Sequence, residues 1–259
     1  MARLDQLLGT DFYHRPTSDT DEIIYGGLDH PEHRERVPGL IAVMGDRAAP
    51  GKERFLACVA LTTWGEPAGY QAVVEAAVCG KRAPWYDVLV DRKYSVDSTF
   101  AQLAVALGDS REMAEEKGTV TQRDSAFQAL VRIADTEYFE DQLGDLMDES
   151  TVRLLLTDIA ETADRGVGSL TGAADVRPRF DLATQLVDLA GAVALVDGAL
   201  AARLATTVLE VEPSRRALVH AVTVLHRSGA PEVRRLGAYM LAVGDERVRG
   251  MATDALRTA

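Results

Sequence analysis

The acidic stretch from Asp135 to Glu149 is the most unusual local feature of this sequence. It holds seven acidic residues and no basic one, with two adjacent aromatic residues near its middle. A row of carboxylates can steer a basic protein surface toward it, and an aromatic pair can anchor the contact. We therefore predict a partner-binding site formed by Asp135, Glu137, Tyr138, Glu140, Asp141 and Asp145. The alternative is a solvated turn and helix whose Tyr138 and Phe139 face the core.

Histidines that could hold a metal ion are few. His30 and His33 stand beside Asp29 and Glu32 and could ligate a divalent cation. A zinc site needs four ligands, which usually come from two clusters, and no second cluster is evident. We interpret this pair as surface loop histidines, and we predict neither a metal nor a cofactor.

Sequence motifs of known enzyme classes are also missing. The chain contains no GxSxG, Walker or HExxH pattern. Gly166, Gly168 and Gly172 have neither the preceding strand nor the following lysine of a phosphate-binding loop. We interpret these glycines as a linker and predict no catalytic residue. The sequence leaves enzymatic activity open and favours a non-catalytic role.

The charge of the chain restricts its partners. The formal net charge is −12, so the chain repels phosphate backbones on average, and nucleic acid is not expected as a partner. The part of the chain from Pro213 onward contains eight arginines and four acids, which makes this end basic.

Cys58 and Cys79 are the only cysteines, and no signal peptide or apolar run long enough for a bilayer is evident. We expect a cytoplasmic protein without a membrane partner.

Helices must position these residues, because no alternating strand pattern is evident. The longest segment without helical periodicity is a polar loop at residues 10–31, and Gly108–Gly118 is expected to be a mobile connection. Within the helix predicted at Glu32–Met44, Pro38 is expected to mark the true start. Helical spacing of apolar residues predicts helices at Met1–Leu8, Glu32–Met44, Pro50–Trp64, Pro67–Val78, Asp97–Leu107, Val120–Ile133, Phe139–Met147, Thr151–Thr162, Phe180–Leu189, Val193–Val208, Pro213–Ser228, Pro231–Val243 and Glu246–Arg257. The fold class is therefore all-α.

A four-residue signature recurs along these helices. An arginine is followed at +3 by a small residue, at +6 by a small or soft one and at +7 by leucine. The small residue lets a neighbouring helix approach, and the arginine stem can cover apolar surface while its head reaches water or a carboxylate. The signature begins at Arg54, Arg123, Arg234 and Arg249.

These Ala- and Leu-rich helix pairs resemble HEAT and armadillo-type repeats. The resemblance is best at residues 50–79 and 213–258, and the spacing between signatures is irregular. It implies an α-solenoid of antiparallel helix pairs that forms a single helical-repeat domain over residues 1–259, with 213–259 as the best-formed terminal repeats. The alternative is a compact irregular helical bundle.

The solenoid resemblance implies a protein-binding role, because stacked helix pairs expose a large curved surface. We predict a non-catalytic immunity or adaptor protein that engages a basic partner protein. The alternative comes from HEAT-like DNA glycosylases, which act on alkylated bases with Trp, Asp and Arg side chains. Trp64, Trp85, Asp87 or Asp91, and Arg123 would take those roles. The strongly negative charge departs from that family, because a face that holds DNA should be basic.

Overall fold

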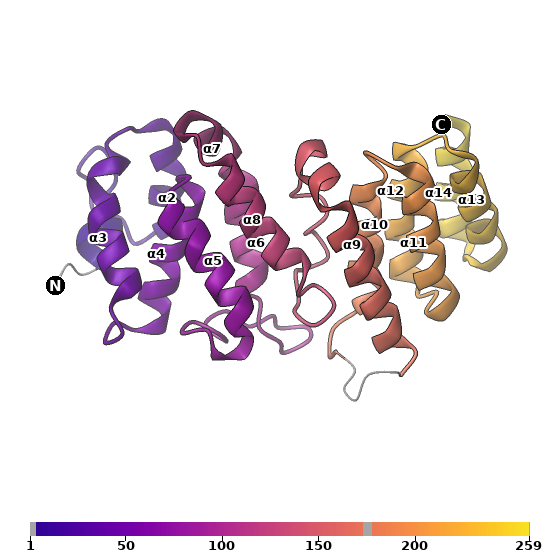
Figure 1. Ribbon diagram of the computed structural model, residues 1–259, viewed down its shortest axis with the longest axis horizontal. Helices are drawn as coiled ribbons and strands as arrows, with labels where there is room; N and C mark the ends of the chain where they lie inside the picture. The colour runs from indigo at the N-terminus through magenta and orange to yellow at the C-terminus, as the bar shows by residue number, and fades with distance from the viewer. Residues whose placement is uncertain (1–3, 173–177, 259) are drawn as a thin grey trace. The chain divides into compact units, whose positions relative to one another are not determined.

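The chain is all-α, as the sequence predicts. A computed structural model describes residues 4–172 and 178–258 (Figure 1). In this described part, β pairing is limited to two isolated bridges, Thr10 with Pro16 and Val90 with Asp97. The described residues form two compact units. Unit 1 comprises the residues up to Asp91 together with 97–130, and unit 2 comprises 92–96 together with the residues from Val131 onward. The single-domain assignment stays a prediction.

Unit 1 is built around one buried helix, α4. Every residue of α4 from Ala57 to Thr63 is buried, and α4 packs against α2, α3, α5 and α6. The helices assigned to unit 1 are α1 (Leu4–Leu8), α2 (Thr20–Asp29), α3 (His33–Gly45), α4 (Gly51–Thr63), α5 (Pro67–Cys79), α6 (Thr99–Asp109), α7 (Arg111–Lys117) and α8 (Val120–Val131), whose last residue already belongs to unit 2.

Three expectations for unit 1 are wrong. The predicted loop at 10–31 contains α2, which begins after the Asp19 side chain caps the backbone N–H groups of Asp21 and Glu22. The predicted mobile connection Gly108–Gly118 contains α7, which ends at Gly118 in the left-handed conformation that glycine tolerates. Pro38 lies inside α3, which begins five residues earlier at His33.

Unit 2 stacks its helices in two rows (Figure 1). One row contains α9, α11 and α13, and the other contains α10, α12 and α14. All twelve residues of α10 are buried, because α9, α11 and α12 all pack against it. The helices are α9 (Glu149–Leu170), α10 (Leu182–Val193), α11 (Gly198–Val211), α12 (Arg215–Arg227), α13 (Pro231–Val243) and α14 (Glu246–Thr258).

Polar side chains begin most helices of unit 2. Asp148, Asp181, Asp197 and Ser214 each accept a hydrogen bond from a backbone N–H in the first turn of the helix that follows. These bonds satisfy donors that have no partner inside the helix. Pro231 begins α13, as predicted. The predicted helix Thr151–Thr162 is extended in α9 to Leu170, so Gly166 and Gly168 are helical, whereas residues 173–177 of the predicted linker lie outside the described residues.

The signature arginines have a role that the sequence analysis did not anticipate. The heads of three of the four donate to main-chain carbonyl groups near the ends of neighbouring helices, at distances of 2.8–2.9 Å. Helix ends leave these carbonyl groups without an intrahelical partner, so a guanidinium is a suitable donor there. The three pairs are Arg54 Nε to Met44 O, Arg123 Nε to Leu107 O and Arg249 Nη1 to Gly244 O.

No helix in the described ranges is both long enough and apolar enough to cross a lipid bilayer.

Candidate functional site

The acidic segment, Asp135 to Glu149, is mostly irregular. The predicted helix Phe139–Met147 is wrong, because this part of unit 2 forms a series of turns that ends where α9 begins at Glu149. Glu140 and Asp141 both have positive φ angles, of 56° and 57°. Two consecutive non-glycine residues in this region are unfavourable and persist only where their surroundings hold them.

Gln185 of α10 holds the first half of the acidic segment. Its side-chain amide donates to the carbonyl groups of Ala134 and Glu137, at 2.6 and 2.9 Å, and its oxygen accepts from the N–H of Phe139 at 2.7 Å. Gln185 is fully buried, and so are Ala134 and Phe139. The side chain therefore supplies three backbone hydrogen bonds that a helix would otherwise supply. This arrangement explains why the segment is stable without being helical.

Asp188, one turn further along α10, holds the second half of the acidic segment. Its carboxylate accepts a hydrogen bond from the N–H of Gly144 at 2.7 Å. A Cβ atom at Gly144 would lie 2.5 Å from the backbone oxygen of Asp188, so the backbones approach too closely for any larger residue. Burial raises the pKa of Asp188 well above its ordinary value, although the bond from Gly144 opposes this change.

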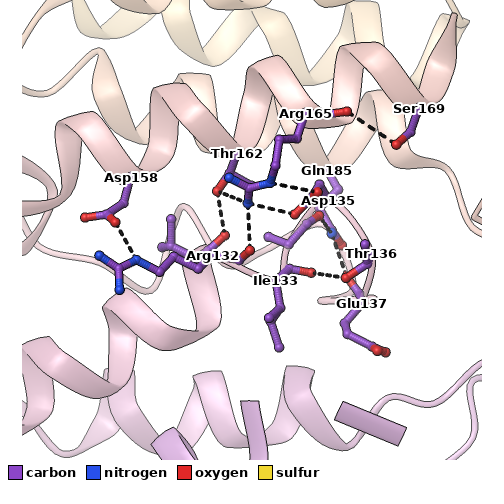
Figure 2. Close-up of polar contacts among 12 residues, drawn as sticks. Arg132, Ile133, Asp135, Thr136, Glu137, Asp158, Thr162, Arg165, Ser169 and Gln185 are labelled. Carbon is purple, nitrogen blue, oxygen red and sulfur yellow. Dashed lines mark hydrogen bonds and ion pairs between the residues drawn. The ribbon is translucent and has the colours of Figure 1, made fainter. Parts of the chain in front are cut away.

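Asp135 is neutralised inside unit 2. Figure 2 shows Arg165 of α9 meeting both carboxylate oxygens of Asp135, at 3.1 and 3.0 Å. The same guanidinium donates to the carbonyl of Arg132 at 2.7 Å and to the hydroxyl of Thr162 at 3.0 Å. The Asp135 side chain is only 10% exposed, so this carboxylate offers little surface to a partner.

The other predicted site residues lie in different environments. Asp145 is exposed and pairs with Arg227 of α12 at 2.9 Å. Tyr138 is buried, as is Phe139, so neither ring is available as a surface anchor. Glu137 is partly exposed and Glu140 is exposed. Of the six predicted site residues, Glu140 and Asp145 are exposed, Glu137 is partly exposed and the other three are buried.

Asp141 is the least ordinary member of the segment. Its side chain is 1% exposed, and one carboxylate oxygen lies 2.5 Å from Nη2 of Arg216 on α12. This contact is an ion pair without hydrogen-bond geometry, and neither carboxylate oxygen accepts a hydrogen bond from the described residues. Burial raises the pKa of Asp141 to about 6, against the attraction of Arg216. Burial is the largest single effect on Arg216 and lowers its pKa, but Asp141, Tyr94, Tyr138 and Asp181 together raise it above its ordinary value. Both pKa values are raised, which favours the neutral form of Asp141 but the charged form of Arg216. The difference follows from exposure, because the Arg216 side chain is 38% exposed.

Aromatic and basic groups of unit 2 surround the Asp141–Arg216 pair. Arg216 Nη1 donates to the hydroxyl of Tyr94 at 2.9 Å, and Lys93 Nζ donates to the same oxygen at 2.6 Å. The ring of Tyr138 lies between Tyr94 and Phe180, with centroid distances of 5.4 and 5.3 Å. A buried carboxyl with a pKa near neutrality beside a guanidinium is the kind of group that can exchange protons at physiological pH. Sequence reasoning missed Arg216 and Tyr94, because nothing in the spacing of residues 94, 141 and 216 connects them.

The interpretation of His30 and His33 as surface loop histidines is wrong for His33, which is buried and begins α3. His33 is buried, its Nδ1 lies 2.8 Å from the carbonyl oxygen of His30, and its Nε2 lies 3.0 Å from Nζ of Lys117. His30 stacks on Phe12 with a centroid distance of 4.9 Å. In the described part of the chain, no group of three or more His, Cys, Asp or Glu residues is arranged to hold a metal ion.

The residues that resemble those of a glycosylase serve mainly in packing. Trp64 is fully buried and its Nε1 donates to the carbonyl of Ile24 at 2.7 Å, while Trp85 is 4% exposed. Arg123 is 3% exposed, and its guanidinium lies over the ring of Phe127 at 4.8 Å. Neither indole therefore offers an open face on which an extruded base could stack.

Exposed acids of unit 1 form a surface that the sequence analysis did not single out. Tyr25 of α2 is 41% exposed and donates through its hydroxyl to Asp109 of α6 at 2.9 Å. Burial, followed by Asp109 and then Asp21, raises the pKa of Tyr25 to about 12. We call Asp21, Glu22, Tyr25 and Asp109 the α2–α6 face. Among the described residues, no ion pair neutralises Asp21, Glu22 or Asp109.

No protein-family model, characterised protein or solved structure matched this chain.

Proposed function

We propose that the chain is a non-catalytic helical protein that binds a basic partner protein in the cytoplasm, as an immunity protein or an adaptor. The observation that carries this proposal is the α2–α6 face, where carboxylates without ion pairs surround an exposed tyrosine. Unit 1 has twelve basic and twenty acidic residues, for a net charge of −8, and unit 2 has sixteen and twenty, for −4. Net negative charge is thus concentrated in unit 1.

Ionic contacts inside unit 2 reduce the contribution of the acidic segment to such an interface. Asp135, Asp141 and Asp145 each face an arginine of α9 or α12. A partner would have to compete with these arginines, which are tethered at high effective concentration. Glu140 remains the member of the segment that is best placed to meet a partner, because it is exposed.

Affinity capture with surface variants tests the proposal. The immobilised chain is incubated with lysate of its source cells at low and high salt, and bound proteins are identified by mass spectrometry. We expect one basic protein to be retained at low salt and released as salt screens the charges. The double charge reversal Asp21→Lys and Asp109→Lys should weaken its binding at least about tenfold, which is about 1.4 kcal/mol.

Two further variants locate the interface. Glu75→Lys changes an exposed residue of α5 that only bonds Gln71, so it makes the same type of charge change away from the α2–α6 face and should retain the partner. Glu140→Lys reports on the acidic segment. Loss of binding by Glu75→Lys to the same extent would show that only net charge matters. Retention of duplex DNA at low salt in place of a basic protein would overturn the proposal.

A further inference from the structure

A single ammonium group joins three elements of unit 1. Lys117, the last residue of α7, donates from Nζ to the carbonyl of Trp64 at 2.7 Å and to Glu66 Oε1 at 2.6 Å. Its third neighbour is Nε2 of His33, the first residue of α3, at 3.0 Å. An ammonium has three N–H donors and no acceptor, so these three partners saturate it. The side chains of Lys117 and Glu66 are only 14% and 18% exposed.

The same contacts determine the protonation state of His33. Nδ1 lies 2.8 Å from the carbonyl oxygen of His30, which accepts only, so Nδ1 carries a proton. Nε2 faces the ammonium of Lys117, which donates only, so Nε2 must be the unprotonated acceptor. Both ring nitrogens are therefore satisfied in the neutral imidazole alone. The ring is buried, with its centroid 5.1 Å from that of Trp64, and it cannot turn to another partner without opening the packing.

We propose that this arrangement, the His33–Lys117 joint, is an acid-sensitive switch that ties the start of α3 to the end of α7 at neutral pH and opens on acidification. Protonation at Nε2 would remove the acceptor for Lys117 and place two cations 3.0 Å apart. The two elements would then separate at this point.

The charges around the joint support this direction. Lys117 of α7 and Arg34 of α3 oppose protonation of His33, whereas Glu66 at the corner between α4 and α5 and the carbonyl of His30 favour it. Burial is the largest effect, and it lowers the pKa of His33 below its ordinary 6.5. The unfolded or opened chain therefore binds a proton that the closed joint does not. The stabilisation of the closed joint is therefore complete above about pH 6.5. As the pH falls below this value, the equilibrium constant for opening rises by up to about tenfold per pH unit.

Neighbouring contacts confine the opening. Arg34 and Glu116 pair at 2.7 Å across the same two elements, but both side chains are more than half exposed, so this pair resists the opening only weakly. Trp64 Nε1 bonds the carbonyl of Ile24 at 2.7 Å and holds the end of α4 to α2. The bond from Trp64 to Ile24 does not involve the ring of His33. We therefore expect local release of the first turn of α3 and of the corner between α7 and α8, with the rest of unit 1 folded.

Hydrogen exchange at pH 7.5 and 5.5, corrected for the intrinsic pH dependence of exchange, tests the switch. In the wild-type chain, protection of peptides covering residues 31–40 and 113–122 should fall by up to about tenfold at pH 5.5, while peptides from α10 should lose none. His33→Gln keeps a neutral donor and acceptor but cannot titrate, so it should show no such loss. His30→Gln is the matched control, because it retains the backbone carbonyl, and it should lose protection like the wild type.

Equal protection of the wild-type peptides at both pH values would overturn the proposal, as would an equal loss in His33→Gln. If His33→Gln does not fold, the titration of His33 in the wild-type chain decides by NMR. A midpoint below 6.5 together with loss of the Lys117 contact supports the switch, and a midpoint at or above 6.5 refutes it.

Discussion

Asp141 and Arg216 form an ion pair in which the aspartate side chain is buried and the arginine side chain is partly exposed. The carboxylate is 1% exposed and accepts no hydrogen bond from the described residues, whereas the guanidinium is 38% exposed and also donates to Tyr94. Removing one partner of a buried pair is usually destabilising, because the remaining charge is left alone. Here the remaining Arg216 would keep contact with water and with Tyr94.

We therefore predict that Asp141→Asn does not destabilise unit 2 at pH 7.5. Asparagine tolerates the left-handed conformation and removes the buried charge. Hydrogen exchange of α10 at pH 7.5 measures the stability of this unit. Asp145→Asn is the control, because Asp145 pairs with Arg227 while 60% exposed, and it should change stability by less than about 1 kcal/mol. A loss of more than about 1 kcal/mol in Asp141→Asn would show that the ion pair is net stabilising.

The pH dependence of unit 2 should follow from the same residue. The pKa of Asp141 is about 6 in the folded chain and about 3.8 in its ordinary state, so the folded chain binds more protons between these values. Stability should therefore increase as the pH falls from 7 to 4, by up to about 3 kcal/mol. Asp188 acts in the same direction. Exchange of α10 peptides across this range checks the trend, and Asp141→Asn should flatten it.

Gln185→Leu should release the first half of the acidic segment. The substitution nearly preserves volume, but it leaves two carbonyl groups and one N–H of the segment without their partner, at a cost of about 1–3 kcal/mol for each buried group. Exchange of residues 134–144 should increase strongly. Thr184→Val on the same helix removes only the hydroxyl bond to Asp181 and should cost about 1 kcal/mol. Equal effects of the two variants would contradict the role assigned to Gln185.

Arg123→Met should destabilise unit 1 through a helix end. The variant keeps an apolar stem of similar length but removes the guanidinium donor to the carbonyl of Leu107, which still accepts from the Ser110 hydroxyl, so the cost should be about 0.5–1.5 kcal/mol. Both tryptophans, Trp64 and Trp85, belong to unit 1, so their fluorescence during urea unfolding reports on this unit. Arg111→Met changes a 57% exposed side chain paired with Glu115 and should stay within about 0.5 kcal/mol of wild type. A null result for Arg123→Met would indicate that packing on Phe127 suffices.

Gly27→Ala should displace α2 from the core of unit 1. The new Cβ would lie 2.4 Å from Nε1 of Trp64, a rigid ring that is itself held by Ile24, so overpacking should cost about 1–3 kcal/mol. Gly45→Ala at the end of α3 is a matched helical control with no atom within 4 Å of its Cβ. Tryptophan fluorescence should respond to the first variant and not to the second.

Local signals in the sequence were sufficient for most of the helices. The all-α class is confirmed, and α13 begins and ends at the predicted Pro231 and Val243. Periodicity, prolines at helix starts and capping side chains act over one or two turns, so they can be recognised without the fold. The same reasoning failed for α2, because Gly26 and Gly27 indicate a turn when read alone. Gly27 lies inside α2, and it is a glycine because a Cβ atom there would clash with Trp64, which lies 37 residues later.

In the candidate site too, some features depend on the local sequence and others on the tertiary structure. The sequence alone determined the net charge of −12, the cluster of acids from Asp135 to Glu149 and the helical class, since each depends on residue type and short-range spacing. Only the tertiary structure decided which of those acids are neutralised, because Arg165, Arg216 and Arg227 come from helices 30 to 82 residues away. It also decided that the segment is not helical, since Gln185 and Asp188 on α10 bond its backbone groups directly, and no local pattern encodes a partner so distant in the chain.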